Sequence, residues 1–395
     1  MMIQAVLGNP NHPEYGVATI PFPIPHDQYA HCMELLEALE IGDAVKTDCK
    51  VEKIDSFYTV LKRAEMLTVN VEELNYLAKR LESFDTGEAA QFQAMAHKLE
   101  LFELKDFINL TFCCQQATVI TDFSDLAAIG RDHYMNLHGG SASVDELNKL
   151  DGEETARQLI DSGSGTITPY GVVYDNGMKL EQIYDGRFFP CYYYEPNAIT
   201  VAVTSKAEPE DTEHITWLYL PMEREEIDRA LLRGGITDPS EIRLSLEDSW
   251  FPHEVLDLLD MDHVDISELN ALVQALDEFS DMSIRKYAAA AVMARPHTTE
   301  QAKHLAENLD LFDFAPSAST PEEYGKYMIR QSGHFDYDEN LDAFYDYEKY
   351  GTERMNAEDG MFTDRGYIAY KGYTSMEEMM NGSQSSHMEM GGLSR

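Results

Sequence analysis

The side chains with the greatest potential for chemistry lie in a run of acids near the end of the chain. The run holds six carboxylates, Asp336, Asp338, Glu339, Asp342, Asp346 and Glu348, interleaved with six aromatic residues, Phe335, Tyr337, Phe344, Tyr345, Tyr347 and Tyr350. A ladder of carboxylates held over packed aromatic rings could take the place of a row of phosphates. The alternative interpretation is a solvated helix face.

The same run contains the beginning of a calcium-binding pattern. Asp336, Asp338 and Asn340 have the spacing that opens an EF-hand loop. Position six of that loop, however, is Leu341 where the motif needs glycine, and position twelve is Tyr347 where it needs a bidentate Glu. The sequence therefore argues against calcium, and we predict no metal site.

Catalytic motifs are missing from the sequence. It contains no H-E-x-x-H metal pattern, no G-x-S-x-G nucleophile turn and no G-x-x-x-x-G-K-[ST] phosphate loop. Paired carboxylates can carry out acid–base chemistry, but with 71 acids such pairs arise by chance. His138-Gly139-Gly140 resembles an oxyanion-hole motif and is better interpreted as a turn. We predict a protein that is not an enzyme, with no catalytic residue and no cofactor.

The charge of the whole chain points to a class of partner. The 395 residues include 30 basic and 71 acidic side chains, for a formal net charge of −41, while 44% hydrophobic residues are enough to build cores. The first 195 residues hold 31 acids and 14 bases, and the remaining 200 hold 40 and 16, so the excess is no acidic tail. Duplex DNA carries one charge per ~1.7 Å, so this excess corresponds to about 20 base pairs. Such a surface repels nucleic acid and attracts proteins that bind it.

Three features suggest a cytoplasmic location. The five cysteines form no C-x-x-C pair and are odd in number, which favours reduced thiols. The N-terminus has no basic region followed by an apolar stretch, so we expect no signal peptide. No apolar run is long enough to span a membrane.

The chain also repeats itself. A shift of 195 residues brings Val69–Phe84 onto Val264–Phe279, with seven of sixteen residues identical, where unrelated sequences would share about one. The same shift pairs Gly130 with Gly325. Near the start the register slips by one residue, so that Ile24-Pro25 meets Leu220-Pro221. We predict a tandem duplication of a unit of about 180–195 residues.

Each unit is predicted to open with strands and an acidic helix, to continue with helices, and to close with a mixed segment. Leu74, Leu77, Leu81 and Phe84 form one apolar stripe at helical spacing, which residues 269–279 repeat. The predicted fold is an elongated α+β chain of two pseudo-repeats. Its expected domains are 1–65 (α+β), 66–115 (helical), 116–195 (α+β), 196–260 (α+β), 261–312 (helical), 313–375 (acidic, α+β) and 376–395 (a disordered tail).

A second acidic stretch lies in the second repeat. Its candidate partner-binding acids are Asp257, Asp260, Asp262 and Asp265, and they are interrupted by leucines. The counterpart in the first repeat, between Glu52 and Glu73, is sparser. The sequence leaves open which of these acids face a partner.

Several segments together resemble the ArdA antirestriction family. GVATIPFPIP, residues 16–25, is similar to the opening of the family, and the helix start Glu73-Leu74-Asn75 to its central domain. VITDFSDLAAIGRDHYM, residues 119–135, resembles its antirestriction motif, with a similar segment at Ser317–Phe335. The acidic run up to Gly351 and then FTDRGYIAY, residues 362–370, resemble its C-terminal end. The resemblance covers most of residues 3–375.

This resemblance implies an inhibitor that mimics DNA and occupies the DNA-binding groove of the Type I restriction–modification methyltransferase and specificity complex. It adds Asp122, Asp125 and Asp132 of the first repeat to the candidate partner-binding acids. Family members usually pair as homodimers, so the two repeats of this chain could form either an internal pseudo-dimer or a homodimer. The alternative function is an acidic decoy for another nucleic-acid-binding protein, such as a CRISPR effector or a nucleoid protein. A scaffold role is a third possibility.

Overall fold

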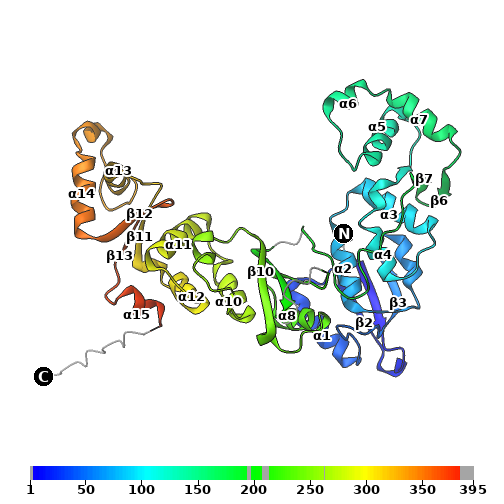
Figure 1. The fold of residues 1–395 in the computed structure, drawn as a ribbon, viewed down its shortest axis with the longest axis horizontal. Helices are drawn as coiled ribbons and strands as arrows, with labels where there is room; N and C mark the ends of the chain where they lie inside the picture. The colour runs from blue at the N-terminus through cyan, green and yellow to red at the C-terminus, as the bar shows by residue number, and fades with distance from the viewer. Residues whose placement is uncertain (1–2, 194–196, 207–212, 262, 383–395) are drawn as a thin grey trace. The chain divides into compact units, whose positions relative to one another are not determined.

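The computed structural model describes residues 3–193, 197–206, 213–261 and 263–382 (Figure 1). With 46% helix and 18% strand in several small antiparallel sheets, the fold is α+β, as predicted. The chain divides into two compact units. The first unit comprises Met1–Glu195, Asp211–Trp217 and Glu223–Thr237, and the second comprises Pro196–Glu210, Leu218–Met222 and Asp238–Arg395.

The first unit contains two sheets separated by helices. The order of its strands is β2-β1-β3-β4 in the opening sheet and β5-β7-β6 in the closing sheet. Its elements are β1 (Ile3–Gly8), η1 (Pro13–Tyr15), β2 (Val17–Phe22), η2 (His26–Gln28), α1 (Tyr29–Ala38), β3 (Cys49–Asp55), η3 (Thr59–Ala64), β4 (Thr68–Val69), α2 (Val71–Glu82), α3 (Thr86–Lys98), α4 (Leu104–Leu110), η4 (Cys114–Gln116), β5 (Thr118–Ile120), α5 (Leu126–Leu137), α6 (Val144–Lys149), α7 (Gly152–Asp161), β6 (Thr166–Thr168), β7 (Gly171–Tyr174) and, later in the chain, α8 (Arg224–Arg233).

The apolar stripe predicted for the helical segment is confirmed in the first unit. Leu74, Leu77 and Leu81 of α2 are buried, and Phe84 follows them into the same core. The next helix, α3, begins with a capping box in which the Asp85 side chain accepts from the Glu88 backbone N–H. Helical spacing and capping residues together determine where these helices begin and which face is buried.

The segment after β7 packs on the helices of the first unit. Asn109 of α4 donates to the backbone oxygen of Tyr184 at 3.0 Å and accepts from its backbone nitrogen at 2.7 Å. The Tyr192 hydroxyl donates to the backbone oxygen of Lys79 in α2 at 2.9 Å. These contacts join the end of the predicted domain 116–195 to the helical region.

From residue 197 onward the described chain contains two further sheets, each of three strands, together with helices. The strand orders are β10-β8-β9 and β11-β13-β12. Apart from α8, the elements are β8 (Ile199–Ser205), β9 (Thr216–Leu220), η5 (Pro239–Glu241), β10 (Ile242–Ser249), α9 (His253–Leu256), α10 (Ile266–Leu276), α11 (Asp281–Ala294), α12 (Thr299–Glu307), η6 (Leu309–Leu311), β11 (Phe312–Pro316), α13 (Pro321–Arg330), η7 (Glu339–Phe344), α14 (Tyr347–Ala357), β12 (Asp359–Thr363), β13 (Gly366–Tyr370) and α15 (Met376–Met380).

Two buried asparagines, Asn75 and Asn270, make similar long-range hydrogen bonds. The Oδ1 atom of Asn75 accepts from the backbone nitrogen of Ile24 at 2.8 Å, and that of Asn270 accepts from Met222 at 2.9 Å. The residue that makes the Ile24-like contact is Met222, so this contact does not follow the one-residue slip that placed Ile24 opposite Leu220. The register of this segment depends on a long-range hydrogen bond that sequence similarity does not reveal.

The predicted disordered tail, residues 376–395, begins with a helix instead. Ser375 and Glu378 form a capping box at the start of α15, and Met379 and Met380 are buried. The His304 ring of α12 hydrogen-bonds to the backbone oxygen of Met380 at 2.8 Å. The methionines gain apolar burial that the amino-acid composition alone did not indicate. Residues 383–395 lie outside the described residues.

No helix among the described residues combines the length and apolar character needed to cross a membrane.

Candidate functional site

The predicted acidic run connects two closely packed helices, α13 and α14. A Cβ atom on Gly325 of α13 would lie 2.0 Å from the backbone oxygen of Tyr347, and one on Gly351 of α14 would lie 1.8 Å from that of Pro321. These distances are shorter than any ordinary contact, so only glycine fits at either position. The helices stand beside the sheet β11-β13-β12 (Figure 1) and share a core with it that includes Tyr324 and Tyr367. The acidic connection therefore begins and ends on a rigid base.

Asp342 lies at the centre of the connection and points back toward the helices. One of its carboxylate oxygens, Oδ1, accepts hydrogen bonds from the hydroxyls of Tyr337 and Tyr347 and from the guanidinium of Arg330. The Tyr337 bond is 2.7 Å long. Arg330 also lies over the rings of Tyr337 and Tyr347, at 5.6 and 5.2 Å from their centroids. One acid thus organises most of the connection.

The environment of Asp342 favours its charged form. Hydrogen bonds from Tyr347 and Tyr337, followed by the bond and charge of Arg330, lower its pKa from 3.8 to about 2. The same arrangement raises the pKa of Tyr337 to about 12. Asp342 is accordingly ionised at neutral pH, with its charge committed to an internal partner.

Two other acids of the run cap local structure. Asp338 accepts from the backbone nitrogen of Asn340 at 2.9 Å and opens η7, and Asp346 accepts from that of Lys349 at 3.0 Å and begins α14. The EF-hand-like residues are therefore the start of a 3-10 turn. Every acid of the run except Asp342 is exposed: Asp336, Asp338, Glu339, Asp346 and Glu348.

The expected layer of aromatic rings beneath the acids is only partly present. Tyr347 is buried, and Tyr337, Tyr345 and Tyr350 are half-buried. Phe335 and Phe344, in contrast, are 50% and 82% exposed, so the prediction was wrong for these two residues. Tyrosine hydroxyls can hydrogen-bond to the central carboxylate, whereas a phenylalanine ring cannot. The tyrosines therefore turn inward while the two phenylalanines remain at the surface.

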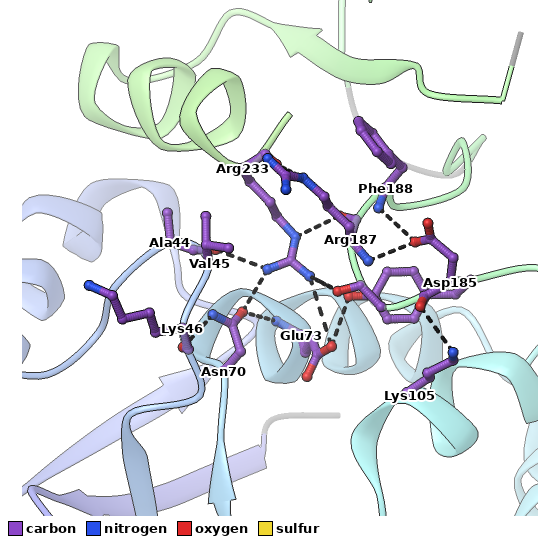
Figure 2. A network of polar contacts seen from close by, with 12 residues as sticks. Ala44, Val45, Lys46, Asn70, Glu73, Lys105, Asp185, Arg187, Phe188 and Arg233 are labelled. Atoms are coloured by element: carbon purple, nitrogen blue, oxygen red, sulfur yellow. Dashed lines mark hydrogen bonds and ion pairs between the residues drawn. The ribbon is translucent and has the colours of Figure 1, made fainter. Parts of the chain in front are cut away.

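Sequence reasoning missed a second polar centre, around Arg233 of α8 in the first unit. Figure 2 shows its guanidinium between the start of α2 and the segment around Arg187. It donates to Asn70 Oδ1 at 3.0 Å, to the Tyr184 hydroxyl, and to three backbone oxygens, of Ala44, Arg187 and Gly186. The Arg233 side chain is only 6% exposed, and Glu73 lies 3.8 Å away. This network encloses a positive charge within a strongly acidic protein.

Burial and neighbouring charge have opposite effects on the pKa of Glu73 in that centre. Burial raises the pKa of Glu73, while the hydrogen bond from Tyr184 and the charge of Arg233 oppose the rise without cancelling it. One turn earlier on α8, Arg229 donates to the Glu72 carboxylate at 2.7 Å. Two arginines four residues apart on an acidic chain were the available signal, but only the tertiary structure reveals their partners.

One protein family matches part of the chain. The family described as antirestriction protein (ArdA) matches residues 212–369. We refer to residues 212–369, which are similar to this family, as the ArdA segment. This ArdA segment contains both α13 and α14 and the whole acidic connection. No curated protein matches the chain.

The ArdA segment also contains the second predicted set of acids, which lies between α9 and α10. Asp257 is exposed, and Asp260 hydrogen-bonds to the ring of His263 at 2.8 Å. Asp265 is the N-cap of α10 and accepts from the backbone nitrogens of Ser267 and Glu268. Asp262 lies outside the described residues. The nearby Glu254, in contrast, is paired internally with Arg365 at 2.6 Å.

Asp122, Asp125 and Asp132 lie before the ArdA match, at the first-unit helix α5. Asp122 is exposed and accepts from the backbone nitrogen of Ser124 at 2.9 Å. Asp125 caps α5 by accepting from Ala128 at 2.9 Å, and Asp132 is exposed on the same helix. The structure thus gathers the six acids of the run at the connection and the start of α14, and distributes the other described candidates over two further segments.

Proposed function

We propose that this antirestriction protein inhibits Type I restriction–modification enzymes by mimicking DNA. In this proposal the carboxylates of the ArdA segment occupy the DNA-binding groove of the methyltransferase and specificity complex. The observation that carries the proposal is the α13–α14 connection, in which five acids are exposed and the sixth, Asp342, pairs with Arg330 of the closely packed helix α13. The family match identifies restriction as the process that is opposed.

The charge supplies both the attraction and its range. A net charge of −41 repels nucleic acid and draws a basic groove toward the protein, so encounters are fast at low salt. Binding of carboxylates in place of phosphates also releases counterions, which makes affinity fall steeply with salt. The protein itself is not expected to bind nucleic acid.

Capping gives the acids fixed positions before binding. Asp338 and Asp346 are each held by a backbone N–H, and Asp342 by three side chains. Acids held in this way lose little conformational freedom when they meet a partner. A solvated helix face, the alternative interpretation of the run, would hold its side chains less firmly.

The proposed action is stoichiometric and takes place in the cytoplasm. It requires no catalytic residue, cofactor or metal, because the inhibitor only competes with DNA for its site. The same electrostatic argument also applies to another nucleic-acid-binding protein, such as a CRISPR effector or a nucleoid protein. The antirestriction family favours the restriction enzyme as the target.

We also propose that the first half of the chain is a second copy of the ArdA unit. Two correspondences support this duplication in addition to the buried asparagines. The closing strands run in equivalent orders, β5-β7-β6 and β11-β13-β12. A ring pair also recurs, since Phe84 and Phe92 have centroids 6.2 Å apart, and Phe279 and Tyr287 6.4 Å. A two-copy chain could replace a homodimer, which measurement of the inhibitor-to-enzyme stoichiometry would test.

The decisive experiment is a titration against a Type I methyltransferase–DNA complex at several salt concentrations. We expect displacement of DNA, relief by excess duplex, and a steep loss of affinity as salt rises. A Type II restriction digest run in parallel tests whether the target is specific. Salt-insensitive inhibition, or a complex that still contains bound DNA, would contradict DNA mimicry.

A further inference from the structure

The 3-10 helix η7 presents its apolar residues to solvent and its polar anchor to the protein. Asp342 points inward to Arg330 and the two tyrosines. Leu341 and Phe344 are 48% and 82% exposed. This is the reverse of the usual arrangement, in which the apolar face of a helix is buried.

The geometry of a 3-10 helix places these two apolar side chains together. Residues three apart are eclipsed in such a helix, because it has three residues per turn. Leu341 and Phe344 are three apart in η7, which spans Glu339–Phe344. They therefore project from one side of the turn, as a small apolar patch.

We call the acidic residues that flank this patch along the chain its acidic rim. Glu339 belongs to the same short helix, and Asp336 and Glu348 lie shortly before and after it, all three exposed. An exposed apolar patch with charged residues near it is characteristic of an interaction surface. The charge of the rim requires a basic partner.

We propose that Leu341 and Phe344 form an apolar anchor for the partner's DNA-binding groove, with Phe344 taking the place of an unstacked base. This inference rests on the proposed function. Enzymes that modify a base extrude it from the duplex and stack it between aromatic or apolar side chains, and methyltransferases are among them. A groove of this kind offers basic side chains for the acidic rim and an apolar surface for the phenyl ring.

The test is a comparison of Phe344→Ala and Phe344→Trp in binding to a Type I methyltransferase. The alanine variant should bind about tenfold more weakly or worse, as expected for a central anchor, and the tryptophan variant should retain affinity. The loss should be equal at low and high salt, because an apolar contact releases no counterions. Neutralising the rim with Asp336→Asn, Glu339→Gln and Glu348→Gln should instead reduce the dependence on salt.

A matched control is available in the first unit. Val144, in the connection between α5 and α7, is 73% exposed, and Val144→Ala should leave binding unchanged. The anchor would be overturned if Phe344→Ala bound with unaltered affinity, or if Phe344→Ala and Val144→Ala lost affinity equally. The proposed function would remain in either case. Failure of the unmodified protein to displace DNA would overturn the proposed function itself. If Phe344→Ala changed only self-association, measured by sedimentation, the patch would belong to a second copy of the chain and the anchor would be rejected.

Discussion

The closing regions of the two units share one framework and differ in what it carries. In the first unit, a Cβ atom on Gly130 of α5 would lie 1.9 Å from the backbone oxygen of Gly152 in α7, as close as the equivalent approach between α13 and α14. The connections between the helices are unlike. The first contains α6, capped by Ser143 and Glu146, and the second contains η7, anchored by Arg330. In both units, glycines allow two helices to pack closely, while the segment that connects the helices differs in structure and in its exposed residues.

The units differ as well where their central helices begin. In the first unit Asn70 caps α2 and also accepts from Arg233, whereas in the second Asp265 caps α10 through Ser267 and Glu268. The cap is common to both, but only the first is enclosed by an arginine. An N-cap residue can therefore be buried against an arginine, as Asn70 is, or remain exposed, as Asp265 is.

The largest effect is expected from Arg233→Met, which removes the feature specific to the first unit. The change leaves Glu73 buried without its cation, and loss of one partner of a buried pair costs about 3–5 kcal/mol. Because the pKa of Glu73 is already raised, the loss of stability should be greater near pH 8 than near pH 5, where Glu73 can take up a proton. Urea unfolding at the two pH values measures this. Equal destabilisation at both would show that Glu73 is not the affected group.

A slightly smaller effect is expected from Gly351→Ala, which tests the shared framework. The new Cβ would meet the backbone oxygen of Pro321 at 1.8 Å, and we expect a loss of about 3 kcal/mol in the stability of the second unit. Gly152→Ala should do the same to the first unit, where the contact with Ala127 is 2.4 Å.

Gly87→Ala is the control for these glycine substitutions, measured by thermal unfolding. Gly87 lies in the first turn of α3 and has only the Asp85 side chain nearby, at 3.2 Å. Alanine there should be neutral or stabilise the unit by up to about 1 kcal/mol. If Gly351→Ala behaved in the same way, the close crossing would be incorrect.

The third prediction asks whether the two units contribute equally to inhibition. Exposed ion pairs contribute about 0.2–1 kcal/mol each, so the triple variant Asp336→Asn, Glu339→Gln, Glu348→Gln should bind about 3- to 150-fold more weakly. Each single change should barely be measurable. The matching first-unit variant changes Asp122, Asp132 and Asp145, an exposed acid of α6, to asparagine, and shows whether that unit also meets the enzyme. A hundredfold loss from one substitution would instead indicate a catalytic or metal-binding role.

The smallest effect concerns the pH dependence of the second connection. The pKa of Asp342 is about 2 in the folded protein, below its usual 3.8. Its stabilisation of the connection through Arg330, Tyr337 and Tyr347 is therefore complete above about pH 4 and is lost as the pH falls through about 2. Near-ultraviolet circular dichroism of the tyrosines should follow this loss. Segment 139–151 of the first unit contains no tyrosine and is silent in this measurement. Arg330→Gln should move the transition to higher pH, and an unchanged midpoint would contradict the assigned anchor.

The amino-acid sequence by itself determined the α+β class and the helical stripe through Leu74, Leu77 and Leu81. These follow from spacing along the chain, which is a local property. It also located the acidic run and the ArdA resemblance, because charge and short motifs can be read directly from residue types.

Only the tertiary structure decided which of those acids are committed internally. Asp342 is anchored by Arg330, twelve residues away, and Glu254 by Arg365, more than a hundred residues away. Such pairings depend on helix packing rather than on spacing, and so do the burial of Met379 and Met380 and the outward position of Phe344. In a chain with 71 acids, residue type alone cannot distinguish a charge that meets a partner from one that holds the fold, because the two differ only in what the fold places beside them.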